Sequence, residues 1–89
     1  MEYYNEIQKD IVSSLYLKRH IGKRHTPIEN LCQRLSQYPC KTIKKELKVL
    51  HNKGLLNFKQ TYHGKDIYLN SKKVKEIKEI ANSKYNNWI

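Results

Sequence analysis

Acidic residues, glycine, proline and cysteine are all scarce in this chain of 89 residues, and long apolar runs are missing. Two cysteines are too few for the disulfide framework of a small secreted domain. No apolar run approaches the roughly 20 residues that a membrane-spanning helix needs. The start of the chain, MEYYNEIQKD, also lacks the pattern of a signal peptide. We therefore expect a soluble cytoplasmic protein with no membrane partner.

The motifs of enzyme and cofactor chemistry are also missing from the sequence. It contains no glycine-rich phosphate loop, and its carboxylates are not paired for acid–base catalysis. His20 and His25 lack the spacing of a zinc protease, and Cys32 and Cys40 are not spaced like a zinc-ligand pair. The sequence therefore predicts a binding protein that is not an enzyme and has no metal or cofactor. It identifies no small-molecule ligand.

The two cysteines have several possible roles. Cys32 falls on the apolar face of a predicted helix, as a core residue would, and Cys40 is expected to be more exposed. A redox role for Cys40 is one alternative, and an internal disulfide between Cys32 and Cys40 is another.

Positive charge is what the chain has in excess. Its 18 lysines and arginines outnumber its 8 acidic residues and give a net charge of +10. A charge this large on a small domain favours a polyanionic partner, nucleic acid before an anionic membrane. The apolar fraction of 38% predicts a small core that dimerisation would help to stabilise.

Residues 26–56 have the pattern of two helices joined by a turn of three or four residues. Thr26, Pro27 and Glu29 match a capping box with proline at the first helical position. The apolar positions of the two helices are Ile28, Leu31, Cys32 and Leu35, and then Ile43, Leu47 and Leu50. Pro39 separates them, and Gly54 stands where a left-handed C-cap is expected. This pattern predicts a helix-turn-helix whose second helix is basic.

The segment before this motif is expected to form a helix and a basic loop. Residues 2–18 place Tyr4, Ile7, Ile11 and Leu15 on one helical face, which predicts a core helix, with target binding as the alternative. Residues 18–25 form a loop that bends at Gly22. Its Lys23 and Arg24 are expected either to touch DNA phosphates beside the main contact or to be solvated.

The segment after Gly54 changes from helical to strand periodicity. Two short runs rich in aromatic and β-branched residues, split by His63-Gly64, predict a β-hairpin with one face packed inward. We expect Leu56 and Phe58 to face Ile67 and Leu69 on that inner side. The hairpin tip is expected to carry Lys59, His63 and Lys65.

The last segment predicts a helix over about residues 71–87 that is capped by Asn70 or Ser71. Its narrow apolar stripe comprises Val74, Ile77, Ala81, Tyr85 (or Lys84) and Trp88. Such a stripe fits packing on its own domain or pairing with a second copy. We favour pairing, with the aid of the first helix, and predict a homodimer through Val74, Ile77, Ala81 and Trp88.

The order helix, helix, helix, hairpin, helix resembles that of winged helix-turn-helix transcription regulators. This broad family includes the MarR, ArsR and PadR groups and many small archaeal and archaeal-virus proteins. If the protein is viral, the expected location is the host cytoplasm. Residues 42–56, TIKKELKVLHNKGLL, are similar to the family's recognition helix and the strand that follows it. Residues 68–77, YLNSKKVKEI, are similar to the return strand of its wing and its final helix, although a threonine more often stands at Asn70. The turn over residues 36–41 is about one residue longer than usual.

The resemblance implies the fold class α+β, mainly α, with one winged-helix domain over residues 1–89. This domain has three helices, a β-hairpin wing and a C-terminal helix at residues 71–89 that serves for dimerisation. It also implies that the outward face of the third helix enters the major groove of double-stranded DNA. The residues on this face are Lys41, Thr42, Lys44, Lys45 and Lys48. The wing would add Lys59, His63 and Lys65, and the flanking loop Lys23 and Arg24.

These features predict a sequence-preferring protein that binds double-stranded DNA and regulates transcription. Lysines without Asn, Gln or Arg on the reading face favour phosphate contact and hence modest specificity. A helix whose charges are merely solvated would show the same lysines, but Glu46 is the only acid within residues 40–53, which weakens that interpretation. The same features also fit a low-specificity architectural or replication-related binder, a winged-helix protein-interaction module or an RNA-binding winged helix.

Overall fold

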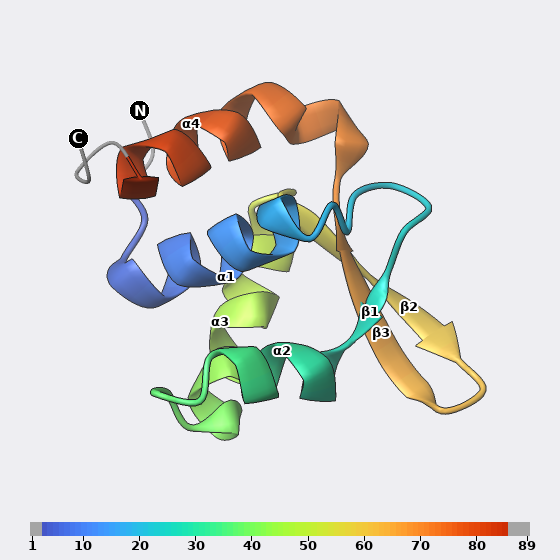
Figure 1. Ribbon diagram of the computed structural model, residues 1–89. Helices are drawn as coiled ribbons and strands as arrows, with labels where there is room; N and C mark the ends of the chain where they lie inside the picture. Colours follow the sequence, from blue (N-terminus) through green and yellow to red (C-terminus); the bar gives the residue numbers. More distant parts are fainter. Residues whose placement is uncertain (1–2, 86–89) are drawn as a thin grey trace.

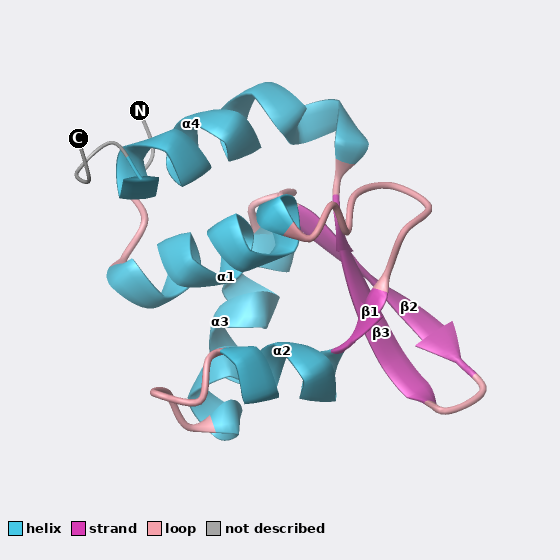
Figure 2. Cartoon of the chain, in the orientation of Figure 1, coloured by secondary structure: helices cyan, strands magenta, loops and turns pink. Residues whose placement is uncertain are grey.

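The structure is a computed structural model that describes residues 3–85, and in these residues helices pack beside a small antiparallel sheet (Figures 1 and 2). The helices are α1 (Glu6–Leu17), α2 (Ile28–Arg34), α3 (Cys40–Asn52) and α4 (Val74–Tyr85), with a 3-10 turn η1 (Ser71–Lys73) before α4. The strands are β1 (Thr26–Pro27), β2 (Leu56–Thr61) and β3 (Gly64–Leu69), in the order β1-β3-β2. The predicted α+β class with mainly helical content is confirmed.

Helix α1 lies at the centre of the fold, between α4 on one side and α2 and α3 on the other, with the sheet at the end of this stack (Figure 1). Its Ile11 and Leu15 are completely buried. The three apolar residues predicted for α3 are also completely buried, namely Ile43, Leu47 and Leu50. Their burial fixes the orientation of α3. Burying one such side chain contributes about 1.5–3 kcal/mol, so these positions decide which face of α3 remains outside.

The start of α1 differs from the prediction. The helix begins at Glu6 because Asn5 forms a capping box with Gln8. The Gln8 backbone N–H donates to Asn5 Oδ1 at 2.8 Å, and the Asn5 N–H donates to Gln8 Oε1 at 3.0 Å. Tyr4 therefore precedes the helix, yet it remains buried, and its hydroxyl donates to Glu76 Oε1 at 2.7 Å.

The capping box predicted at Thr26 is wrong. Thr26 and Pro27 form β1, in which Thr26 pairs with Ile67 of β3. Pro27 is the N-cap of α2 with an extended backbone, φ −60° and ψ 144°, and contributes no side-chain cap. The φ that proline imposes suits both a helix start and an extended segment, and the pairing with β3 selects the extended one. The loop from Leu35 to Pro39 is also longer than the predicted turn.

The hairpin confirms the predicted inner face and corrects the position of the turn. Leu56 pairs with Leu69, and Phe58 pairs with Ile67. The turn residues are 62 and 63, and Gly64 is the first residue of β3, with φ 134°. Gly54 ends α3 with φ 81°, as the predicted left-handed C-cap requires.

The apolar stripe of α4 packs on its own domain. The sequence instead favours pairing with a second copy through the same residues. Ile77 is completely buried and Ala81 is 2% exposed, beneath the contact between α4 and α1. Asn70 caps η1, the turn that precedes α4, since its side chain accepts a hydrogen bond from the Lys72 N–H. In this fold Ile77 and Ala81 are not available to a second copy. Val74 is half-buried, and Trp88 lies outside the described residues. Homodimerisation itself stays a prediction.

A disulfide joins Cys32 of α2 to Cys40, the first residue of α3, with Cα atoms 5.2 Å apart. The sequence leaves several roles open for the two cysteines, and the structure shows the internal disulfide. Both are half-buried, so Cys32 is not the fully buried core residue that its position suggested. The bridge ties the two helices together across the long loop. Among the helices of residues 3–85, none combines the length and apolar character needed to cross a membrane.

Candidate nucleic-acid interface

The outward face of α3 presents a row of lysines. Lys41, Lys44, Lys45 and Lys48 are exposed, as predicted, whereas Thr42 is half-buried. The helix is held in this orientation by its buried apolar face and by a polar contact with α1, in which Gln8 Nε2 donates to Glu46 Oε1 at 2.9 Å. The one acidic residue of α3 is therefore engaged by α1.

These lysines are not neutralised by neighbouring carboxylates. Throughout residues 3–85, Lys84 is the only lysine or arginine with a carboxylate oxygen within 4.0 Å of its side-chain nitrogen. Several of the acidic side chains are instead bound to other partners: Glu76 to Tyr4, Glu46 to Gln8, Asp10 to Tyr38 and Lys84, and Asp66 to His25. The positive charge of the α3 face is therefore available to an external anion.

A hollow of about 340 Å³ separates α3 from the hairpin and brings predicted residues of both elements together. Lys44 and Lys48 of α3 and Lys65 of β3 line it, together with Phe58. Lys65 Nζ lies 5.8 Å from the centre of the Phe58 ring, at cation–π distance. The sequence predicts Phe58 only as a core residue. In the structure its half-buried ring also contacts Lys65 of the interface.

Glu29 was not predicted to belong to the site, yet it lines the same hollow at the start of α2. It is exposed, and its carboxylate would repel a phosphate there. Glu29 lies beside the hairpin because the chain passes from β1 directly into α2.

The three residues predicted at the hairpin tip do not lie together. Successive side chains of a strand point to opposite faces, so Lys65 shares the face of Ile67 and Phe58, whereas Lys59 lies on the other face, opposite Asp66. Only His63 belongs to the turn itself, where its neighbour Tyr62 is fully exposed. The structure therefore separates Lys59 from the lysines of α3.

The flanking loop is anchored to the end of β3 and away from the hollow. The Gly22 N–H donates to the Leu69 carbonyl at 3.0 Å, and the Leu69 N–H donates to the His20 carbonyl at 2.8 Å. Lys23 and Arg24 are exposed, as expected, but neither lines the hollow between α3 and the hairpin.

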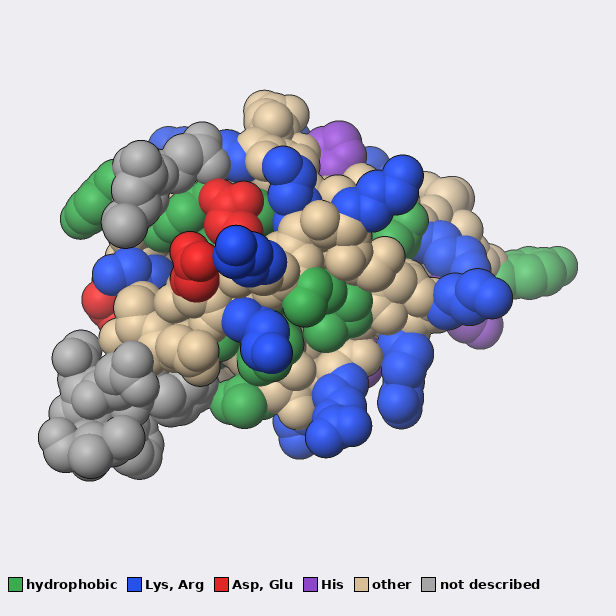
Figure 3. Space-filling model, turned by 90° about the horizontal axis from the view of Figure 1, so that it is seen from above, with side chains coloured by type: hydrophobic (Ala, Val, Ile, Leu, Met, Phe, Trp, Pro, Cys, Tyr) green, Lys and Arg blue, Asp and Glu red, His purple; other side chains and the backbone are tan. Residues whose placement is uncertain are grey.

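The face above α4 has a mixed charge that changes along its length. In Figure 3 acidic side chains appear over α4, on the half away from the hairpin, among several lysine or arginine side chains. Toward the hairpin the same view shows lysine, arginine and histidine side chains without acidic neighbours. On this face, positive charge is thus densest toward the hairpin.

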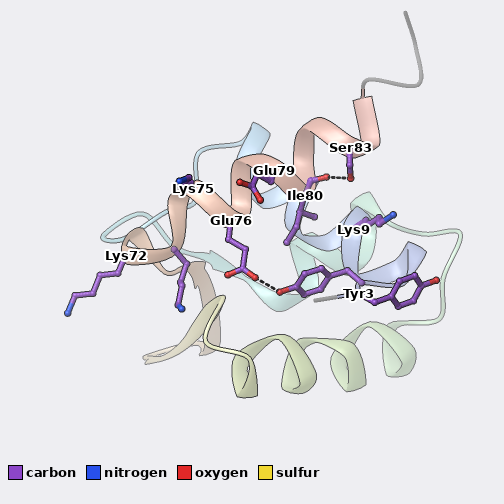
Figure 4. Close-up of a pocket in the computed structure, with 10 residues that line it drawn as sticks. Tyr3, Lys9, Lys72, Lys75, Glu76, Glu79, Ile80 and Ser83 are labelled. Carbon is purple, nitrogen blue, oxygen red and sulfur yellow. Dashed lines mark hydrogen bonds between the residues drawn. The ribbon is translucent and has the colours of Figure 1, made fainter. Parts of the chain in front are cut away.

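A larger hollow, of about 570 Å³, lies between the N-terminal segment and α4 (Figure 4). Two of its polar groups are bonded within the protein, since Glu76 accepts from Tyr4 and Ser83 Oγ donates to the Ile80 carbonyl at 2.9 Å. Lys72 and Lys75 lie at its edge, and the Lys72 side chain extends outward (Figure 4). Lys9, Lys73 and Glu79 also line it, so its wall carries charges of both signs.

Comparisons with protein-family models, with curated proteins and with solved structures found no match for this chain. In the described part of the chain, no group of three or more His, Cys, Asp or Glu side chains is arranged to hold a metal ion.

Proposed function

We propose that this chain is a winged-helix protein that binds double-stranded DNA through α3 and the hairpin. The order α1, β1, α2, α3, β2, β3, α4 supports this assignment. The observation that carries the proposal is the row of exposed, unpaired lysines on α3, with Lys65 of the hairpin across the hollow from Lys44 and Lys48.

The dimensions of α3 suit the major groove. A helix rises about 1.5 Å per residue, so Lys41 and Lys48 are separated by about 10 Å along its axis. The major groove of B-DNA is about 12 Å wide and admits a helix. Lys44 and Lys45, in the middle of the row, would face base edges or the adjacent phosphates. Lys65 would meet the backbone at the edge of the groove, where it adds affinity without reading sequence.

The proposed activity is sequence-preferring binding, as in a transcription regulator. Less selective, architectural binding is the second candidate, and one observation favours it. The exposed side chains of the reading face are lysines, and Thr42 is half-buried. Lysine is a flexible point charge and lacks the planar fork with which arginine recognises guanine.

One experiment separates these candidates. Binding sites are selected from random duplex DNA, and affinity for a selected and a scrambled site is then measured at several salt concentrations. An enriched motif supports the regulator, and a palindrome would also support binding by two copies. Enrichment without a motif supports the architectural candidate. No binding at low salt contradicts both, because contacts with phosphates must strengthen as salt falls.

A matched pair of variants tests the assigned surface. The double variant Lys44→Ala/Lys45→Ala removes two charges from α3, and Lys72→Ala/Lys75→Ala removes two exposed charges from η1 and α4. We expect the first to weaken binding much more than the second. Equal losses would mean that net charge, and not the α3 face, governs binding.

A further inference from the structure

A third hollow, of about 480 Å³, lies between α1 and the end of α2 and is separate from the α3 lysines. Helix α1 contributes Ser13 and its C-cap residue, Lys18, to the wall, and the end of α2 and the loop after it contribute Arg34 and Gln37. Asp10 and Lys84 line it as well. Cationic groups, one carboxylate, hydroxyls and an amide thus surround one open space.

Two groups of this hollow are buried without a hydrogen-bond partner. Arg34 Nε and Nη2 have no acceptor within residues 3–85, and Ser13 Oγ has no partner there either. Ser13 is only 1% exposed. Buried polar groups in folded proteins are nearly always hydrogen-bonded, and a buried charge without a partner is costly. Arg34 and Ser13 both belong to the wall of the hollow, but these particular atoms have almost no accessible surface, so an acceptor in the hollow would reach them only after a small shift of the side chains that cover them.

The charges of the hollow favour an anion at Arg34. Burial lowers the pKa of Arg34, and a guanidinium nevertheless stays protonated in proteins. The Asp10 carboxylate lines the same hollow, but it is engaged by Lys84 and by the Tyr38 hydroxyl. The hydrogen bond with Asp10 also raises the pKa of Tyr38. Asp10 is therefore held by these two partners and leaves Arg34 free.

We propose that this hollow binds a small oxyanion, a carboxylate or phosphate group, on the Arg34 guanidinium. The planar fork of arginine matches two oxygens of such a group, and the unpartnered Oγ of Ser13, a residue of the same wall, is a further donor once the wall opens. Lys18 is exposed at this hollow and adds positive charge. The hollow of Figure 4 differs in that its Glu76 and Ser83 already have partners. The proposal is independent of DNA binding.

Inorganic phosphate and acetate are suitable probes, titrated into the full chain at constant ionic strength against sodium chloride. Backbone amide NMR signals and the arginine Nε–H signals report the site, and the Arg34 signal is assigned by its absence in Arg34→Lys. We expect the Arg34 Nε–H and the Ser13 and Gln37 amides to shift together and to saturate at one concentration. A stronger response to phosphate than to acetate, or the reverse, identifies the preferred group.

Two variants with the same loss of charge complete the test. Arg34→Gln should abolish the saturable shift of the Ser13 amide, whereas Lys23→Gln, which removes an exposed loop charge, should keep it. Arg34→Lys should weaken binding at least several-fold, because it retains the charge and loses the fork. Shifts that rise linearly with phosphate, or that are equal in the wild type and Arg34→Gln, would overturn the proposal. If Arg34→Gln does not fold, the saturation test on the wild type and on Lys23→Gln still decides.

Discussion

The disulfide between Cys32 and Cys40 gives the most quantitative prediction. It closes a short loop, with a sequence separation of 8, and this loop joins α2 to the first residue of α3. Cross-linking removes conformations from the unfolded chain, and the chain-entropy relation gives about 2.5 kcal/mol of stabilisation for a loop of this length. The free energy of unfolding of a domain this size is about 4–13 kcal/mol, so the bridge would supply a large share of it.

The corresponding change in melting temperature follows from the unfolding entropy. About 2.1 cal/mol/K per residue over this chain gives an expected decrease of about 13 °C when the bridge is lost. The measurement is thermal unfolding followed by circular dichroism, for the wild type with and without reductant and for Cys32→Ser/Cys40→Ser. The double variant should melt near the reduced wild type, and reductant should not change it further.

Two results would refute this reasoning. One is a reduced wild type that melts within a degree or two of the oxidised protein. The other is a thiol assay on the unfolded, unreduced chain that detects two free thiols. The control is Ser83→Ala, which alters a small exposed polar side chain and leaves the cysteines unchanged. This variant should retain the full sensitivity to reductant.

Three further predictions concern single residues. Lys44→Ala should lower both affinity and discrimination between a selected and a scrambled site, whereas Lys65→Ala should weaken all sequences about equally and reduce the salt slope by about one contact; the reverse pattern would contradict the assigned roles. Arg19→Gly should raise the free energy of unfolding by about 0.5–1 kcal/mol. Arg19 has φ 60° at the end of α1, and glycine adopts that conformation without strain. A lower melting temperature of the variant would contradict this prediction. Burial, with help from the Arg34 charge, lowers the pKa of His20 below its ordinary value of 6.5, so the unfolded chain binds this proton more readily and stability should fall as the pH drops through 6.5. Melts at pH 7.5 and 5.5 should differ less for His20→Gln than for the wild type, and an equal difference would exclude this contribution.

Local patterns were sufficient to predict the elements whose conformation depends on neighbouring residues. The spacing of Ile43, Leu47 and Leu50 identified α3 and its outward lysines, and Gly54 marked its end. β1 could not be found this way. The Thr26-Pro27 segment satisfies the local rules for a helix start, and only pairing with Ile67, distant in sequence, makes it extended.

The site was predictable in part for the same reason. Exposure of the α3 lysines followed from the helical period, and strand alternation alone would have placed Lys59 and Lys65 on opposite faces. The contribution of Phe58 depends on the approach of the hairpin to α3, which is a tertiary contact. The environment of Arg34 is likewise set by packing, since no sequence pattern distinguishes it from a solvated arginine at a helix end.

Strand β3 has a consequence for how the protein would respond to a load on the hairpin. It is the middle strand of the sheet and pairs with β2 along the hairpin and with β1 just before α2 (Figure 2). The hairpin is therefore not a free arm hinged at its base. A force that bends it would be transmitted through β3 to Thr26 and Pro27, and from there to the first turn of α2. Because the disulfide links α2 to the start of α3, the hairpin and the lysine row belong to one mechanical unit and should move together.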